Sequence, residues 1–275
     1  MKLADLHLHT CFSDGTWSPE ELASQARAHG LDAVALTDHD SVDGCERMEV
    51  ACVIEGIEFI PGSEITAEVD GQEVHILGYW LNTRSEALRS QLVRFQEVRQ
   101  NRVQEIVVRL NENGVGLSEF VVRTLADCEA PGRLHVARAL VQQGYARDCD
   151  HAFERFLKKG RPGFVSKPRM SAGDAVALIH EAGGVSVLAH PGLYRNGGII
   201  PRLKEVGIDG LECWHTKHSE AESNVFIRKA ADLGLVATGG SDCHGMAKGC
   251  PLIGRVKLPY QQVEELKERR PSAVD

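Results

Sequence analysis

Histidine and carboxylate residues of the types that bind cations recur along the chain where β-strands are expected. His7 and His9 alternate along the first strand, so a period of two places both imidazoles on one face, where they can bind one cation. Asp14 follows in the turn Ser13-Asp14-Gly15. The other candidates, each on or just after a later strand, are His39, Glu64, His75, His190, Asp242 and His244. Imidazole and carboxylate together suit Mn, Zn or Fe, and the lack of cysteine among them argues against a purely structural zinc site.

Strands and helices alternate in the parts of the chain that carry these residues. A capping box at 18–21 with Pro19 at the first helical position predicts a helix that ends near Gly30, and Val69-Asp70-Gly71 predicts a hairpin turn. Short apolar runs predict strands at 3–9, 33–37, 58–66, 72–81, 185–189, 210–213 and 235–238. Repeated strand–helix units predict a parallel sheet, open or closed into a barrel. Functional groups gather at the carboxyl ends of barrel strands, because the loops that follow the strands meet there.

Residues 82–168 interrupt this alternation. They are predicted to form helices at 85–113, 118–126, 134–143 and 149–157, and they contain no strong strand signal. The segment has 15 Lys and Arg against 10 Asp and Glu, whereas the rest of the chain has 16 against 29. An acidic core suits cations, and a basic segment beside it suits an anionic substrate.

Length and composition limit the classes of protein to which the chain can belong. Its 275 residues suffice for one large α/β domain, or for a core domain with an insertion. The net charge of −8 argues against broad nucleic-acid binding. No C-x-x-C pair occurs among the eight cysteines, no apolar run approaches the roughly 20 residues of a membrane span, and the N-terminus has no signal-peptide pattern. We therefore expect a cytoplasmic protein with free thiols, with no membrane association and no stable protein partner.

The motifs match those of a known family. His7-x-His9, Ser13-Asp14-Gly15, Thr37-Asp38-His39-Asp40, Glu64, His75, Ala189-His190-Pro191 and Gly240-Ser241-Asp242-x-His244 occur in order, and together they resemble the motifs of the PHP (polymerase and histidinol phosphatase) superfamily. The match covers most of the chain outside the helical segment. Within the superfamily, the chain most resembles nucleoside 3′,5′-bisphosphate phosphatases and short-RNA 5′–3′ exonucleases.

The resemblance implies a fold and a metal centre. The implied fold is an α/β, distorted (β/α)7 TIM-like barrel formed by residues 1–81 and 169–275, with residues 82–168 as a helical insertion that forms a lid over the site. Three divalent metal ions are implied, with Mn expected and Zn or Fe as alternatives. The implied sites are His7, His9, Glu64 and Asp242 for the first ion; Glu64, His75 and His190 for the second; and Asp14, His39 and His244 for the third.

Other residues are candidates for proton transfer and for substrate binding. His218, His215 and Asp38 could supply a proton to the leaving oxygen; the resemblance favours His218, also as a phosphate contact, and His215 is expected at the surface. Arg133 and His135 stand at a predicted helix start, which is an anion-binding position. With Lys167, they are expected to bind a second phosphate of the substrate.

These observations predict a metal-dependent phosphoesterase that acts on a small phosphorylated nucleotide. The favoured reaction is hydrolysis of the 3′-phosphate of nucleoside 3′,5′-bisphosphates such as pAp. A 5′–3′ exoribonuclease acting on short RNA and a histidinol phosphate phosphatase are the alternative enzymes. An inactive metal-binding PHP module is the alternative outside catalysis. A metal-dependent amidohydrolase is disfavoured, because no lysine stands at a matching strand end.

Overall fold

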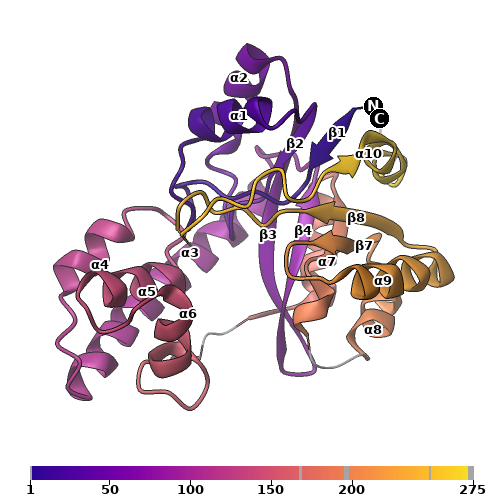
Figure 1. Ribbon diagram of the computed structural model, residues 1–275. Coiled ribbons are helices and arrows are strands. Elements are labelled where there is room, and N and C mark those ends of the chain that lie inside the picture. The colour runs from indigo at the N-terminus through magenta and orange to yellow at the C-terminus, as the bar shows by residue number, and fades with distance from the viewer. Residues whose placement is uncertain (1, 167–168, 195–197, 248, 272–275) are drawn as a thin grey trace.

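Seven strands curve into a nearly closed barrel at the centre of the molecule (Figure 1). The computed structural model describes residues 2–166, 169–194, 198–247 and 249–271. The barrel strands are β1 (Leu3–Asp5), β2 (Ala33–Leu36), β3 (Glu58–Val69), β4 (Gln72–Tyr79), β6 (Val185–Leu188), β7 (Gly210–His215) and β8 (Val236–Gly240). Two short strands, β5 (Met170–Ser171) and β9 (Leu258–Pro259), pair with β3 and β1. The predicted seven-stranded α/β barrel is confirmed.

The barrel is parallel except at one strand. The order of its strands is β8-β7-β6-β4-β3-β2-β1, and β4 runs antiparallel to both β3 and β6. The reversal follows from the predicted hairpin, in which Asp70 and Gly71 have φ values of 51° and 75°. Two successive residues with positive φ form the tight turn that suits the twist of antiparallel strands. The start of β4 therefore lies at the same edge of the barrel as the carboxyl ends of the other strands.

The first strand is shorter than predicted. It ends at Asp5, and residues 6–9 continue beside the chain that follows β8. The backbone N–H of Leu6 donates to the Gly239 carbonyl at 3.3 Å, and that of Asp242 donates to the His7 carbonyl at 2.9 Å. Gly240 permits this approach, because a Cβ there would lie 2.3 Å from the Cβ of His7. The junction that closes the barrel thus also carries predicted metal ligands from both ends of the chain.

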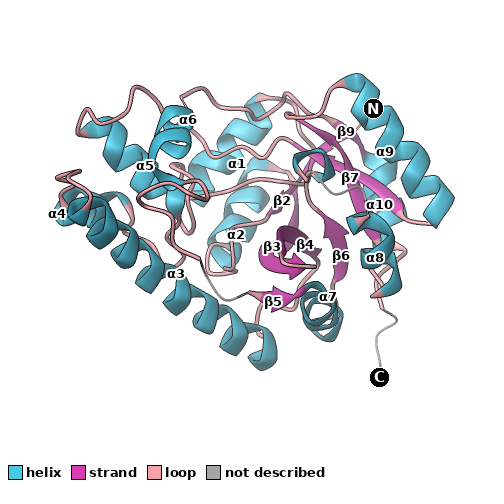
Figure 2. Cartoon of the chain, turned by 90° about the horizontal axis from the view of Figure 1, so that it is seen from below, coloured by secondary structure: helices cyan, strands magenta, loops and turns pink. Residues whose placement is uncertain are grey.

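Side chains alternate between the inside and the outside of the barrel. On β2, Ala33 and Ala35 belong to an apolar cluster inside the barrel, whereas Val34 and Leu36 pack with the surrounding helices. The helices around the barrel are α1 (Pro19–Ala28), α2 (Cys45–Glu55), α7 (Ala172–Glu181), α8 (Ile199–Glu205), α9 (Glu220–Leu233) and α10 (Tyr260–Lys267), with a short 3₁₀ turn η2 (Pro191–Leu193) (Figure 2). In α1 the predicted capping box forms between Ser18 and Glu21. None of the described helices is long and apolar enough to cross a bilayer.

The helical insertion forms a lobe beside the barrel (Figure 1). It consists of α3 (Glu86–Glu112), α4 (Glu119–Leu125), α5 (Arg133–Gln142), α6 (Cys149–Ala152) and the π-helix η1 (Phe153–Leu157). The predicted helices are confirmed, and the last of them continues from α-helical into π-helical geometry. The lobe has its own apolar core, built from residues such as Ile106, Leu110 and Leu140.

A buried ion pair attaches this lobe to the barrel. Arg99 on α3 donates from Nε to Asp40 Oδ2 at 2.6 Å, and from Nη2 to the hydroxyl of Thr66 at 3.1 Å. Asp40 Oδ1 also accepts the backbone N–H of Thr66 at 2.8 Å. Gln96, one helical turn before Arg99, donates to the Asp40 carbonyl at 3.4 Å. The insertion is therefore held at the barrel edge where β2 ends and β3 passes.

Candidate metal centre and phosphate-binding cavity

The predicted metal ligands meet at one edge of the barrel. His7 and His9 follow β1, His39 follows β2, and His190 follows β6. Glu64 lies within β3, where its backbone pairs with that of His39. The other members of the set are Asp14 in the turn after His9, Asp242 and His244 after β8, and His75 near the start of the reversed strand β4.

Glu64 lies at the centre of this set. Its side chain is 1% exposed, and both of its oxygens face imidazole nitrogens. Oε2 lies 3.4 Å from His7, 3.3 Å from His9 and 2.9 Å from His39, and Oε1 lies 2.8 Å from His75 and 3.0 Å from His190. Burial raises the pKa of Glu64, but the surrounding imidazoles, His39 first, outweigh burial and hold its pKa well below the ordinary value. Glu64 is therefore an anion that can bridge neighbouring cations.

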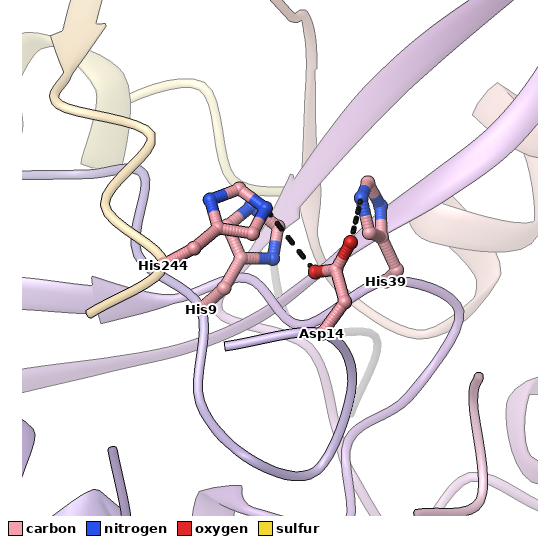
Figure 3. Close-up of side chains that lie close together, drawn as sticks. All are labelled: His9, Asp14, His39 and His244. Carbon is pink, nitrogen blue, oxygen red and sulfur yellow. Dashed lines mark ion pairs between the residues drawn. The ribbon is translucent and has the colours of Figure 1, made fainter. Parts of the chain in front are cut away.

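Asp14 forms a second cluster with three histidines (Figure 3). Its Oδ1 lies 3.1 Å from Nε2 of His244, and its Oδ2 lies 3.8 Å from Nε2 of His39. The rings of His9 and His244 stack with centroids 4.1 Å apart. Each of the four residues offers one ligand atom, and these atoms all lie within 4.8 Å of one another. This geometry suits one cation.

Asp242 connects the clusters. Its Oδ1 lies 3.3 Å from His9 and 3.6 Å from His7. Asp242 and His190 have left-handed backbones, with φ values of 53° and 31°. Non-glycine residues adopt this strained conformation where the surrounding structure requires it, often at functional sites. Here it occurs just after two strands, where the His190 side chain lies beside Glu64 and the Asp242 side chain lies beside His7 and His9.

Several buried polar atoms in these clusters have no hydrogen-bond partner among the described residues. They include Nε2 of His7, both ring nitrogens of His9, Oδ1 of Asp14 and Oε2 of Glu64. Buried polar atoms are nearly always hydrogen-bonded, so such a concentration needs an explanation. Divalent cations would provide one, because imidazole nitrogens and carboxylate oxygens are ligands for Mn and Zn. The residues present thus fit a metal centre.

Glu212 supports this centre from behind. Its Oε1 accepts from Nδ1 of His7 at 2.9 Å, and its Oε2 accepts the backbone N–H of His190 at 2.7 Å. With Nδ1 of His7 donating, Nε2 keeps its lone pair directed at the cluster. A carboxylate that orients a ligating histidine is the usual outer partner in metal sites. Glu212 stands at a strand end in the sequence, but only the fold shows which histidine it orients.

The expectation that His215 is a surface residue is wrong. It is 3% exposed, and its Nε2 lies 3.6 Å from Oδ2 of Asp242. Its Nδ1 accepts the backbone N–H of Lys217 at 3.1 Å, so the ring proton is on Nε2. The N–H of His215 is therefore directed toward Asp242 but lies beyond hydrogen-bond distance of it.

Asp38 does not line the cavity, although the sequence made it a candidate for proton transfer. Its carboxylate accepts from the Thr10 backbone N–H at 2.7 Å and from the hydroxyls of Thr10 and Ser13 at 2.5 and 2.6 Å. These bonds shape the loop that presents Asp14. The structure thus shows Asp38 positioning this loop, and its role in proton transfer stays a prediction.

His218, the other residue predicted for proton transfer, is also held by the backbone. Its Nε2 accepts the backbone N–H of Gly192 at 3.1 Å, so Nδ1 carries the proton and donates to the Cys213 carbonyl at 3.0 Å. Both ring nitrogens are therefore engaged by the backbone, and His218 does not line the cavity. It holds the segment after His190 against β7.

A cavity of about 340 Å³ lies between the ligand residues and the insertion. Arg99 and Arg102 from α3 and Arg133 from α5 line its insertion side. Burial, with Arg133 adding to it, lowers the pKa of Arg102 to about 10. Such a shift indicates clustered positive charge that a bound anion would stabilise. The spacing of Arg99 and Arg102, three residues apart on one helix, places them on one face and is the sequence signal for this pair.

Arg133 is the predicted substrate-binding residue that the structure places in this cavity. Its Nη2 lies 3.3 Å from Oε1 of Glu73, and its guanidinium lies 5.7 Å from the ring centre of Phe153. His135, by contrast, is 2% exposed and caps α5, because its Nδ1 accepts the Gly132 backbone N–H at 3.0 Å. His135 does not line the cavity, and its contact with substrate stays a prediction. Lys167 lies outside the described residues.

Comparisons with known proteins agree with this geometry. The PHP domain family model matches residues 5–149. A Haemophilus influenzae protein named 5′-3′ exoribonuclease is 34% identical, covering 88% of this chain and 90% of its own length. A Chromobacterium violaceum protein named 3′,5′-nucleoside bisphosphate phosphatase is 34% identical, covering 92% and 91%. A crystal structure from Bifidobacterium adolescentis, described as a putative metal-dependent phosphoesterase, superposes with a TM-score of 0.89 at 30% identity, covering 98% of this chain and 97% of that one.

Replacing Glu212 should weaken metal binding. In Glu212→Gln one carboxylate oxygen becomes an NH2 group, which opposes the N–H of either His7 or His190. Loss of such an outer partner lowers metal affinity by about 10–100-fold. Titration of Mn²⁺ against a competing chelator measures the affinity. Glu222→Gln on the outer helix α9 is the matched control, and equal affinities in the two variants would contradict the role of Glu212.

His135 should make stability depend on pH. Burial lowers its pKa from 6.5 to about 4, so between these values the unfolded chain binds a proton that the folded chain does not. Stability is therefore lost as the pH falls through this window. Relative to His135→Asn, the wild type should lose about 3 kcal/mol of unfolding free energy between pH 7 and pH 4, at 1.36 kcal/mol per pKa unit. Urea unfolding of both proteins at each pH measures the difference, and parallel pH profiles would contradict it.

Proposed function

Because the chain belongs to the PHP domain family of metal-dependent phosphoesterases, we propose that it removes one phosphate from a small nucleotide, namely the 3′-phosphate of nucleoside 3′,5′-bisphosphates such as pAp. One observation carries the proposal. Metal-ligand residues form one side of the cavity, and three arginines form the opposite side. A substrate with two phosphates matches both sides, because one phosphate can lie at the metal centre while the other lies among the guanidiniums.

The proposal assigns the nine ligand residues to three divalent ions, with Mn expected and Zn or Fe as alternatives. When bound, such ions supply an activated water at neutral pH and neutralise the oxygens of the phosphate under attack. The side chains around them keep the ligands in place. Glu212 orients His7. The hydroxyl of Tyr194 contacts Nδ1 of His190 at 3.2 Å and leaves Nε2 directed at Glu64.

The insertion would act as a lid over this centre. It brings Arg99, Arg102 and Arg133 to the cavity, and the buried Arg99–Asp40 pair holds α3 at the barrel edge. Arg133 is joined to Glu73 on the barrel, so a phosphate that enters would compete with a carboxylate for the same guanidinium. Closing the lid excludes water and strengthens the remaining charge interactions.

A second candidate reaction is 5′–3′ hydrolysis of short RNA. The similarity to the Haemophilus influenzae exoribonuclease favours it, and the same metal centre would serve it. A cytoplasmic location suits both reactions. It is also consistent with the described cysteines, all of which are free thiols as in proteins of reducing compartments.

Metal-dependent phosphate release tests the proposal. We expect the Mn²⁺-loaded protein to release phosphate from pAp, and EDTA to abolish this activity. His7→Ala/His9→Ala should lose at least about 1,000-fold in kcat/KM, or about 4 kcal/mol of transition-state stabilisation. His29→Ala/His151→Ala, two histidines outside the centre, is the control. Full activity of the first variant would refute the metal centre, and turnover of histidinol phosphate with none of pAp would refute the substrate.

Arg133 should distinguish substrates with one and two phosphates. Arg133→Gln removes a charged contact to the second phosphate, so kcat/KM for pAp should fall by about 10–100-fold, the equivalent of about 1.5–3 kcal/mol for a hydrogen bond to a charged group. The value for 3′-AMP should change little, because this substrate lacks the 5′-phosphate. Steady-state kinetics on both compounds measure the effect. Equal losses on both substrates would show that Arg133 does not bind the second phosphate.

A further inference from the structure

A second and larger cavity, of about 710 Å³, lies between the insertion and the barrel. The insertion contributes the ends of α4 and α5 and the start of α6. The barrel contributes Lys217 after β7 and, from the chain after β8, Ala247, Gly249, Cys250, Leu252 and Arg255. None of the nine predicted metal ligands lines this cavity, so it is separate from the catalytic cavity.

This cavity is lined by more cations than anions. Arg138, Arg147, Lys217 and Arg255 line it, together with Asp148 and Asp150. Arg147 pairs with Asp148 at 3.0 Å, whereas no ion pair joins Arg138, Lys217 or Arg255 to any other residue that the structure describes. In a chain with a net charge of −8, three cations without carboxylate partners on one cavity are a local site for anions.

Half-buried apolar side chains lie between these cations. They are Leu125, Val141 and Leu252. Arg147, Lys217 and Arg255 are exposed. An apolar surface surrounded by cations matches single-stranded nucleic acid, whose bases seek apolar surfaces while its phosphates seek Lys and Arg.

The two cavities share two of their walls. Helix α5 contributes Arg133 and Leu134 to the catalytic cavity and Arg138 to the second one, about 7.5 Å further along at 1.5 Å per residue. The segment after β8 contributes His244 to the first cavity and Ala247 to the second. The two cavities therefore adjoin the same helix and the same segment after β8.

From these observations we infer that the second cavity binds the 3′ part of a short single-stranded RNA whose 5′ end lies at the metal centre. The cations come from four separate segments and do not converge from one element, which suits a row of phosphates more than a single one. This inference extends the second candidate reaction, hydrolysis of short RNA. It rests on the proposed function only for the purpose of the binding, because RNA binding itself does not require turnover.

Binding as a function of chain length and salt tests the inference. The probes are 3′-fluorescein-labelled, 5′-phosphorylated RNAs of two and eight nucleotides with phosphorothioate linkages that resist hydrolysis, bound to the metal-loaded protein and followed by anisotropy. We expect the eight-nucleotide strand to bind at least tenfold more tightly. Arg138→Gln/Arg255→Gln should remove most of this gain and reduce the slope of log K against log salt by about 1.4, at about 0.7 per phosphate contact of a single strand.

Control variants keep the test decisive. Arg228→Gln on the exposed outer face of α9 should bind the eight-nucleotide strand like the wild type. Arg255→Gln alone changes only an exposed side chain, so it should fold normally and show a smaller loss in the same direction. Equal affinity for the two lengths, or an unchanged salt slope in the double variant, would overturn the inference. Absence of phosphoesterase turnover would refute the proposed function and leave this binding result to stand or fall separately.

Discussion

A single carboxylate among five imidazoles determines how this barrel edge is built. Glu64 is almost completely buried, and removal of a charged carboxylate from water costs several kcal/mol unless partners compensate it. Every neighbouring strand end supplies such a partner. The buried nitrogens and oxygens of this cluster find partners only when cations or protons lie between them. The burial of Glu64 among histidines therefore both shapes the fold and creates a binding site.

The rest of the structure serves this constraint at two levels. The first is orientation. Glu212 accepts from Nδ1 of His7 and from the backbone N–H of His190. Asp5 accepts the backbone N–H groups of His7 and Ser241, which joins the first and last barrel strands. The second is access. The Arg99–Asp40 pair attaches the insertion beside the centre, so positive charge from a separate helical lobe faces the metal-ligand residues across the cavity.

Residue type alone does not separate catalytic groups from structural ones. Asp38, His135 and His218 all have side chains that could transfer protons or bind phosphate. In the fold each one makes hydrogen bonds that hold local structure: Asp38 in a loop, His135 at a helix start and His218 at a strand connection. His215 shows the opposite case, since a residue expected at the surface lies buried beside Asp242.

The sequence by itself predicted alternating strands and helices, an interrupting helical segment, and cation-binding residue types on or after the strands, because periodicity and residue type are local features. The closed barrel and the assignment of residues to three ions came from the family resemblance. Only the tertiary structure decided which side chains support the predicted ligands. The reversal of β4 brings His75 to the common edge, and the position of α3 selects Arg99 and Arg102 over the other basic residues of the insertion. The positions of His75, Arg99 and Arg102 depend on strand direction and on contacts between segments far apart in the chain. A local sequence pattern contains no information about either. The histidines and carboxylates on and after the strands were thus visible from the start, while their shared dependence on Glu64 appeared only in the folded chain.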